Sequence, residues 1–71
     1  MIKSGEKLFY INSVGSVFDA VAVGDERSGA VAVEVSHKDG RRESFDIGTL
    51  HVCRTLRAAQ IVSSKRAPAK Q

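Results

Sequence analysis

A chain of 71 residues is long enough for one small domain, which excludes a multidomain enzyme and any fold built on a doubly wound sheet. Its hydrophobic content of 42% is that of a globular protein, and its formal net charge of +3 invites a comparison with nucleic-acid-binding proteins. The single cysteine, Cys53, excludes an internal disulfide, so we expect a reducing, cytoplasmic environment.

The apolar segments of the chain are short. Runs such as 20–23 fall far below the roughly 20 residues that span a bilayer. Residues 1–7 lead into no apolar signal-peptide core with a small-residue cleavage site. We therefore expect a soluble, unprocessed protein that makes no membrane contact.

The positive charge is distributed unevenly along the chain. Residues 1–53 hold six basic and eight acidic residues, a net charge of −2. Asp46 is the last acidic residue, and five basic residues follow from position 54 onward: Arg54, Arg57, Lys65, Arg66 and Lys70. The body of the domain is therefore slightly acidic and its C-terminal segment is basic, so the net charge alone overstates the case for a basic binding face.

Short apolar segments separated by turn residues predict antiparallel β structure in the first part of the chain. Three strands are expected over residues 7–12, 17–23 and 30–37, with glycine-containing loops between them. The first strand carries Phe9 and Tyr10 in adjacent positions, so one of the two rings must point into the core.

The next two expected strands show the alternation of a half-buried sheet. The second carries valines on one side and other apolar residues on the other side: Val17, Val21 and Val23 against Phe18, Ala20 and Ala22. Asp19 falls on the valine side, where we expect a bulge or an edge position. The third alternates strictly, and its odd-numbered valines should face the core: Val31, Val33 and Val35.

An Asp-Gly pair at 39–40 marks a hairpin turn after the third strand. A two-residue turn would place Val33 opposite Asp46. A three-residue loop over 38–40, with its glycine in the left-handed conformation, places Val33 opposite Phe45 instead. We predict the second register, because a slip by one residue would turn the apolar side chains of the fourth strand towards water.

After the fourth strand, residues 48–50 predict a tight turn and residues 51–54 a short fifth strand. The following segment, 55–63, fits either an extended chain or a short helix that docks on the body through a narrow apolar stripe, formed by Val52, Leu56, Ala59 and Val62. Composition predicts a disordered basic tail over 64–71. The expected organisation is therefore a small β-barrel over 1–54, a segment over 55–63 that is either extended or a short helix docked on the barrel, and that tail.

Five short strands with an Asp-Gly hairpin turn and a Gly-Thr-Leu turn are typical of a small barrel, whose closure removes exposed strand edges. The stretches Gly5–Leu8, Ala20–Val23 and Val33–Leu50 resemble a Src-homology-3-like barrel of the Tudor kind, a resemblance at the level of the fold over residues 5–54. It implies an all-β fold, a small five-stranded antiparallel barrel with a short C-terminal helix or tail. Proteins with this barrel bind nucleic acids, methylated tails, proline-rich peptides or other proteins, so the resemblance implies a binding module.

Two of those binding modes need more aromatic residues than this chain has. A cage for a methylated side chain takes three or four aromatic rings, and a groove for proline-rich peptides is also lined by them. The chain has four aromatic residues and no tryptophan, and the predicted register places Phe45 in the core. We therefore expect neither a complete cage nor a proline-peptide groove.

Residues with metal or catalytic chemistry are few. The neutral candidates for a metal ligand or a nucleophile are His37, His51 and Cys53, whereas a structural zinc site usually takes four ligands at recognisable spacing. The carboxylates have little concave volume to desolvate them in so small a barrel, and the glycines match no phosphate-binding spacing. We therefore expect no metal, no cofactor and no enzymatic activity.

The remaining signal is basic and predicts contact with the backbone of RNA or DNA. The expected phosphate-binding residues lie in the hairpin and after the barrel: Lys38, Arg41 and Arg42, then Arg54, Arg57, Lys65 and Arg66. Phe9 or Tyr10 would stack on a base. This interpretation requires the hairpin and the C-terminal segment to converge on one surface.

The alternative interpretation is a protein-interaction or inhibitory adaptor, in which a face or an edge of the sheet contacts a host or partner protein. Such a short barrel would suit an accessory protein of a phage or a mobile element. If the two basic regions do not converge, the adaptor interpretation is favoured. The sequence predicts neither the identity of the partner nor the oligomeric state.

Overall fold

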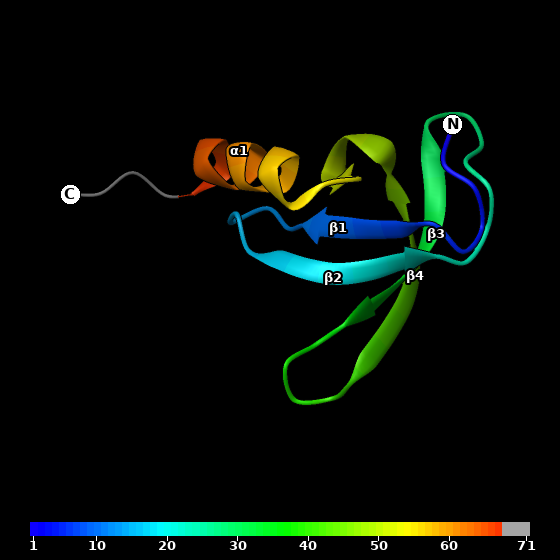
Figure 1. The fold of residues 1–71 in the computed structure, drawn as a ribbon, viewed down its shortest axis with the longest axis horizontal. Coiled ribbons are helices and arrows are strands. Elements are labelled where there is room, and N and C mark those ends of the chain that lie inside the picture. Colours follow the sequence, from blue (N-terminus) through cyan, green and yellow to red (C-terminus); the bar gives the residue numbers. More distant parts are fainter. Residues whose placement is uncertain (68–71) are drawn as a thin grey trace.

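Five antiparallel strands form a single sheet in the computed structural model, which describes residues 1–67 (Figure 1). The strand order is β4-β3-β2-β1-β5, so the first four strands form a meander and the fifth returns to the first. The elements are β1 (Lys7–Ile11), β2 (Val17–Ala22), β3 (Ala30–Ser36), β4 (Arg42–Gly48), a 3-10 turn (Thr49–His51), β5 (Val52–Cys53) and α1 (Leu56–Arg66). The predicted class, all-β with five antiparallel strands and a short C-terminal helix, is confirmed.

The register predicted for the β3–β4 hairpin is confirmed. Val33 pairs with Phe45 along this ladder. At the turn, the N–H of His37 donates to the carbonyl oxygen of Arg41 at 2.8 Å, and Gly40 adopts a φ of +92°. The left-handed conformation costs little conformational energy at this position, because glycine has no β-carbon that would clash with the backbone.

β1 ends at Ile11, one residue earlier than expected, because Asn12 starts a turn. Its side-chain oxygen Oδ1 accepts hydrogen bonds from the backbone N–H groups of Val14 at 3.1 Å and Ser16 at 2.8 Å. An asparagine that bonds the backbone two residues ahead in this way favours a turn over a continued strand.

The main core lies on the concave side of the sheet. It contains the three alternating valines of β3 together with small and large apolar residues of the neighbouring strands: Ile2, Leu8, Ala20, Ala22, Val31, Val33, Val35 and Val52. Because the side chains of a strand alternate between its faces, the other side of β2 lies outside this core. Val21 is 39% exposed and Val23 is 51% exposed.

The structure corrects the expectation of a bulge or an edge position at Asp19. β2 is an inner strand, and Asp19 pairs in unbroken register with Phe9 of β1 and Ser36 of β3. The exposed carboxylate needs no irregularity, because it lies on the solvent side of the sheet and contacts Lys7 at 3.1 Å.

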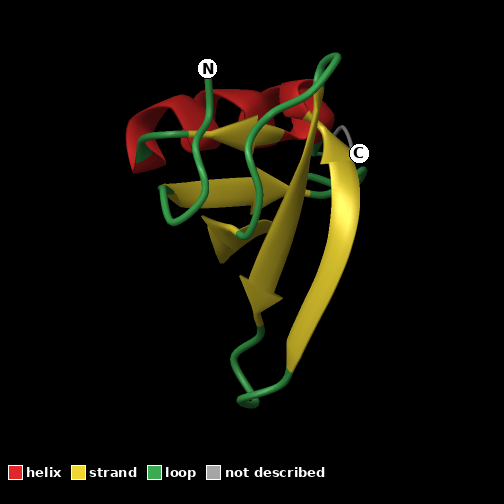
Figure 2. Cartoon of the chain, turned by 90° about the vertical axis from the view of Figure 1, so that its right-hand side faces the viewer, coloured by secondary structure: helices red, strands yellow, loops and turns green. Residues whose placement is uncertain are grey.

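The sheet is not closed, so the expected barrel closure is also corrected. β4 and β5 are its two edges among residues 1–67. β5 has only two residues, which pair with β1, and it offers no length to reach β4. β3 and β4 run across the direction of β1 and β2, so the sheet bends over the core, and the β3–β4 hairpin projects from the body (Figures 1 and 2).

α1 lies along β1 and contacts β1, β5 and β2 on the side away from the hairpin (Figure 1). It begins after Thr55, whose side-chain oxygen accepts a hydrogen bond from the N–H of Ala58 at 3.1 Å. Ala59 is fully buried against the sheet, whereas Leu56, expected in the same apolar stripe, is 50% exposed. The helix is too short and too polar to cross a membrane.

The helix continues to Arg66, so the expected boundary between helix and tail at residue 63 is wrong. Composition favoured disorder for residues 64–66, but contacts with the loop between β1 and β2 hold this last turn. The hydroxyl of Ser63 donates to the carbonyl oxygen of Gly15. The last residues of the predicted tail, 68–71, lie outside the described residues.

Candidate functional site

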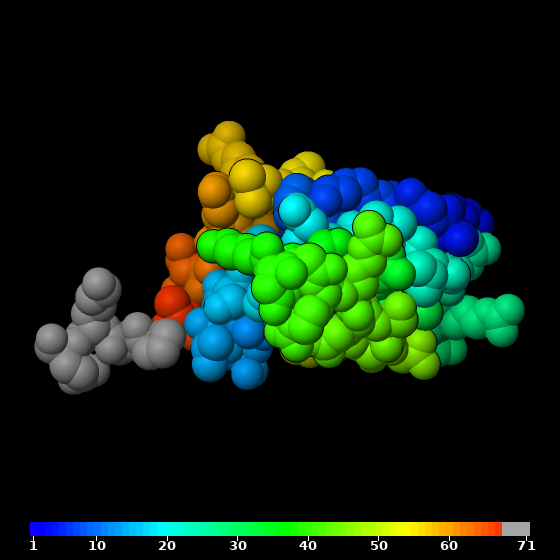
Figure 3. Space-filling view, turned by 90° about the horizontal axis from the view of Figure 1, so that it is seen from below, coloured from blue at the N-terminus to red at the C-terminus, as the bar shows by residue number. Residues whose placement is uncertain are grey.

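An open groove of about 600 Å³ lies between the β3–β4 hairpin and the outer face of β1 and β2, and the first residue of α1 contributes to one wall. Its lining residues are Phe9, Val17, Phe18, Asp19, Ser36, His37, Lys38, Asp39, Arg41 and Leu56. Figure 3 shows this side of the molecule, where the green hairpin lies in front of the blue and cyan residues of β1 and β2. We call this feature the groove.

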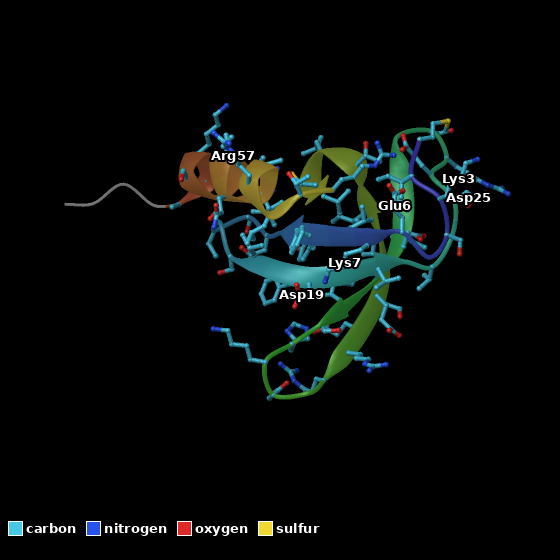
Figure 4. All side chains as sticks on the ribbon, viewed as in Figure 1. Lys3, Glu6, Lys7, Asp19, Asp25 and Arg57 are labelled. Carbon is cyan, nitrogen blue, oxygen red and sulfur yellow. The ribbon has the colours of Figure 1, made fainter. Side chains whose placement is uncertain are left out.

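Phe9 places an aromatic ring in the groove, and a cation already lies against it. The ammonium of Lys7 is 5.1 Å from the centre of the Phe9 ring and 3.1 Å from a carboxylate oxygen of Asp19. Lys7 and Asp19 lie close together on the ribbon in Figure 4. A ring face beside a carboxylate is an arrangement that attracts an ammonium or guanidinium group.

Tyr10, the other residue predicted to stack on a base, points to the opposite side of β1. Its ring lies 5.9 Å from that of Phe18 and 5.4 Å from that of Phe45, and all three rings pack against the core. Of the two adjacent aromatic residues, Tyr10 is therefore the inward one. Phe9 therefore lines the groove. Phe18 and His37 also line it, and their rings meet edge to face with their centres 5.3 Å apart.

Both arginines of the hairpin lie close to carboxylates. The guanidinium of Arg41 contacts Asp39 at 2.7 Å, and that of Arg42 lies 3.8 Å from Glu34. The backbone N–H of Arg41 and then its guanidinium hold the pKa of Asp39 below its usual value. A third carboxylate, that of Glu43, contacts His37 at 2.7 Å, although without the geometry of a hydrogen bond.

The β3–β4 hairpin, residues 30–48, therefore carries a formal net charge of −1. Its three lysine and arginine side chains stand against four carboxylates: Lys38, Arg41 and Arg42 against Glu34, Asp39, Glu43 and Asp46. A polyanion that approached the cations would meet these carboxylates at the same time. This excess of carboxylates weakens the electrostatic attraction on which phosphate binding depends.

The predicted phosphate-binding residues that follow β5 do not join those of the hairpin. Arg54 contacts Glu6 at 2.7 Å. Glu6 also accepts a hydrogen bond from the backbone N–H of Lys3, and this bond, ahead of the charge of Arg54, holds its pKa below the usual value. Arg57 projects from α1 away from the hairpin (Figure 4), and Lys65 is exposed on the same helix.

Arg66 has a structural role that the sequence did not suggest. Its guanidinium donates hydrogen bonds to the carbonyl oxygens of Ile11 at 2.9 Å and Leu50 at 3.1 Å. It therefore ties α1 to the end of β1 and to the 3-10 turn. Its acceptors are backbone atoms far away in the chain, and no side-chain pattern in the sequence indicates them.

The described part of the chain, residues 1–67, contains no group of three His, Cys, Asp or Glu side chains that could hold a metal ion. His51 lies in the 3-10 turn and not in the fifth strand, so it does not share a strand face with Cys53. The comparisons with known proteins found no match, whether among family models, curated proteins or solved structures. A function for this chain therefore has to be inferred from its own residues.

Proposed function

We propose that the chain is a non-enzymatic protein-interaction module that holds a segment of a partner protein in the groove. The observation that carries this proposal is the failure of the two basic regions to converge. The hairpin cations lie among carboxylates, Arg54 is paired with Glu6, Arg66 binds backbone carbonyls, and Arg57 projects from the opposite side of the molecule.

The chemistry of the groove supports a protein segment as its occupant. Apolar side chains from three different elements meet there, namely Phe9 of β1, Val17 of β2 and Leu56 of α1. Leu56 is 50% exposed, so an apolar side chain of a partner would remove apolar surface from water. The charged groups at the rim, Lys38 and the Arg41–Asp39 pair, offer hydrogen-bond donors and acceptors to a peptide backbone.

This proposal can be tested by selecting binders from a library of random displayed peptides against the whole chain. We expect selected peptides to lose binding to Leu56→Glu, which places a charge in the groove. A carboxylate in the first turn of a helix is favourable, so this variant should fold. The matched control is Ile61→Glu, which changes an equally exposed apolar residue on the same helix outside the groove, and which should bind normally.

Either of two results would reject the groove as the binding site. The library would yield no peptide that binds above background, or its binders would respond equally to the two substitutions. Circular dichroism of both variants shows whether each has kept its fold.

A second candidate function, binding of single-stranded nucleic acid, is favoured by one specific observation. The groove brings together Phe9, Lys38 and Arg41, three residues predicted to stack on a base or to contact phosphates. Aromatic stacking with flanking cations is the usual chemistry of single-strand binding. This candidate expects affinity for labelled DNA or RNA oligonucleotides to fall steeply as salt is raised, and to weaken in Lys38→Ala. An absence of binding at low salt would exclude it.

A further inference from the structure

The outer edge of β4 is unpaired among residues 1–67. β4 bonds to β3 on one side, and it is the first strand in the order of the sheet. Figure 2 shows β4 at the outside of the projecting hairpin, with no other strand beside its free edge. An exposed edge of this length presents a row of backbone donors and acceptors that can pair with another strand.

The register of the hairpin determines which residues present those groups. The N–H of His37 bonds to the carbonyl oxygen of Arg41, and in an antiparallel ladder hydrogen-bonded and non-bonded pairs alternate. Odd-numbered residues of β4 therefore direct their backbone groups to β3. Arg42, Ser44 and Asp46 direct theirs outward, and all three side chains are exposed.

The charges of these three residues complement those of the same three residues in a second copy that runs antiparallel to the first. An antiparallel pair centred on Ser44 places Arg42 opposite Asp46 of the second copy, and Asp46 opposite its Arg42. A shift of either strand by two residues retains the backbone bonds but loses both charge pairs. Opposite charges directly across a strand pair stabilise it, and like charges destabilise it.

We propose that two copies of this chain associate through β4, as a two-fold antiparallel strand pair centred on Ser44. Within the described residues Asp46 forms no ion pair, and Arg42 has only the long contact of 3.8 Å to Glu34, so both charges are available. The other edge strand, β5, has only two residues, so it offers few backbone groups for a head-to-tail association in which β4 of one copy pairs with β5 of the next. Arg42, Ser44 and Asp46 do not line the groove, so this inference does not depend on the proposed function.

Sedimentation equilibrium of the whole chain, up to about 1 mM, measures this association. We expect a monomer–dimer equilibrium in the unchanged chain. Asp46→Arg and Arg42→Asp each place like charges opposite one another twice, and each should weaken the dimer about tenfold or more. The double variant that exchanges the two residues restores opposite charges and should dimerise again. Arg57→Asp makes the same charge change as Arg42→Asp on α1 and should leave the dimer unchanged.

Amide hydrogen exchange provides a second measurement that needs no variant. The N–H of Ser44 should exchange more slowly as the protein concentration rises, whereas that of Glu43, which faces β3, should not respond. A chain that stays monomeric at the highest concentration would overturn the proposal. So would a dimer that both single variants leave intact, or a folded double variant that does not recover association.

Discussion

The backbone of Gly15 lies so close to Ser63 that a β-carbon on Gly15 would come within 2.7 Å of the Ser63 carbonyl oxygen. The loop between β1 and β2 and the last turns of α1 are therefore packed backbone to backbone. Ser63 also donates its hydroxyl to the carbonyl oxygen of Gly15. This contact fixes the end of the helix on the sheet and explains why the helix continues beyond the residue at which composition predicted its end.

Replacement of Gly15 by alanine should therefore destabilise the domain in two ways. The residue has a φ of +89°, which an L side chain rarely adopts, and the added methyl group would push the helix away. We expect a loss of about 2–4 kcal/mol in the free energy of unfolding, measured by urea denaturation. Gly5→Ala is the matched control, because Gly5 has a φ of +88° with nothing near its β-carbon position. It should lose only about 1 kcal/mol, and equal losses would contradict the close contact.

Arg66→Met should loosen the attachment of α1. The variant keeps the apolar part of the side chain but leaves the carbonyl oxygens of Ile11 and Leu50 without their donor. We expect a loss of about 1–3 kcal/mol and faster amide exchange throughout the helix. Lys65→Met, at the neighbouring exposed position, should change neither quantity. An Arg66 variant as stable as the Lys65 variant would show that these hydrogen bonds contribute nothing.

Thr55 should be required as the residue that caps α1. Thr55→Ala removes the oxygen that accepts a hydrogen bond from the N–H of Ala58, and it should cost about 1 kcal/mol of stability. Thr55→Ser retains that oxygen and should retain most of the stability. Thermal unfolding of the three proteins measures the difference, and an alanine variant that unfolds with the serine variant would argue against the cap.

Stability should depend on the ionisation of Glu6. The N–H of Lys3, and then the charge of Arg54, hold the pKa of this carboxyl below 4.5 in the folded state. Its contribution is therefore fully present above pH 4.5 and is lost as the pH falls through the folded-state pKa. The stability advantage of the unchanged chain over Glu6→Gln should shrink over that range. NMR titration of the Glu6 carboxyl gives its pKa directly, and a value at or above 4.5 would contradict the prediction.

Local patterns in the sequence were sufficient to predict the hairpin. The strict alternation in β3 and the glycine of the turn leave one register in which Val33 and Phe45 share the core, and the structure has that register. Local sequence could not predict which of Phe9 and Tyr10 points into the core. Tyr10 is the inward residue because Phe18 and Phe45, from two other strands, provide its packing partners.

The candidate site was less predictable, because its electrostatics depend on contacts between distant residues. Arg54 and Glu6 meet only after β5 has paired with β1. A count of charges along the chain cannot reveal such a pair, nor an arginine that binds backbone carbonyls as Arg66 does. That the sheet stays open was not predictable either, because closure depends on the length of β5. The 3-10 turn takes up His51, so β5 begins only at Val52.

During synthesis the ribosome delivers β1 early and Arg66 late. Arg66 bonds to the carbonyl oxygen of Ile11 across a sequence separation of 55 residues, and β5 supplies the second neighbour of β1. Contacts this far apart form slowly, because the intervening chain first loses conformational entropy. The strands of the meander, which are neighbours in the sequence, can therefore pair before the helix docks, and the end of β1 gains its contact with Arg66 only after residue 66 has been synthesised.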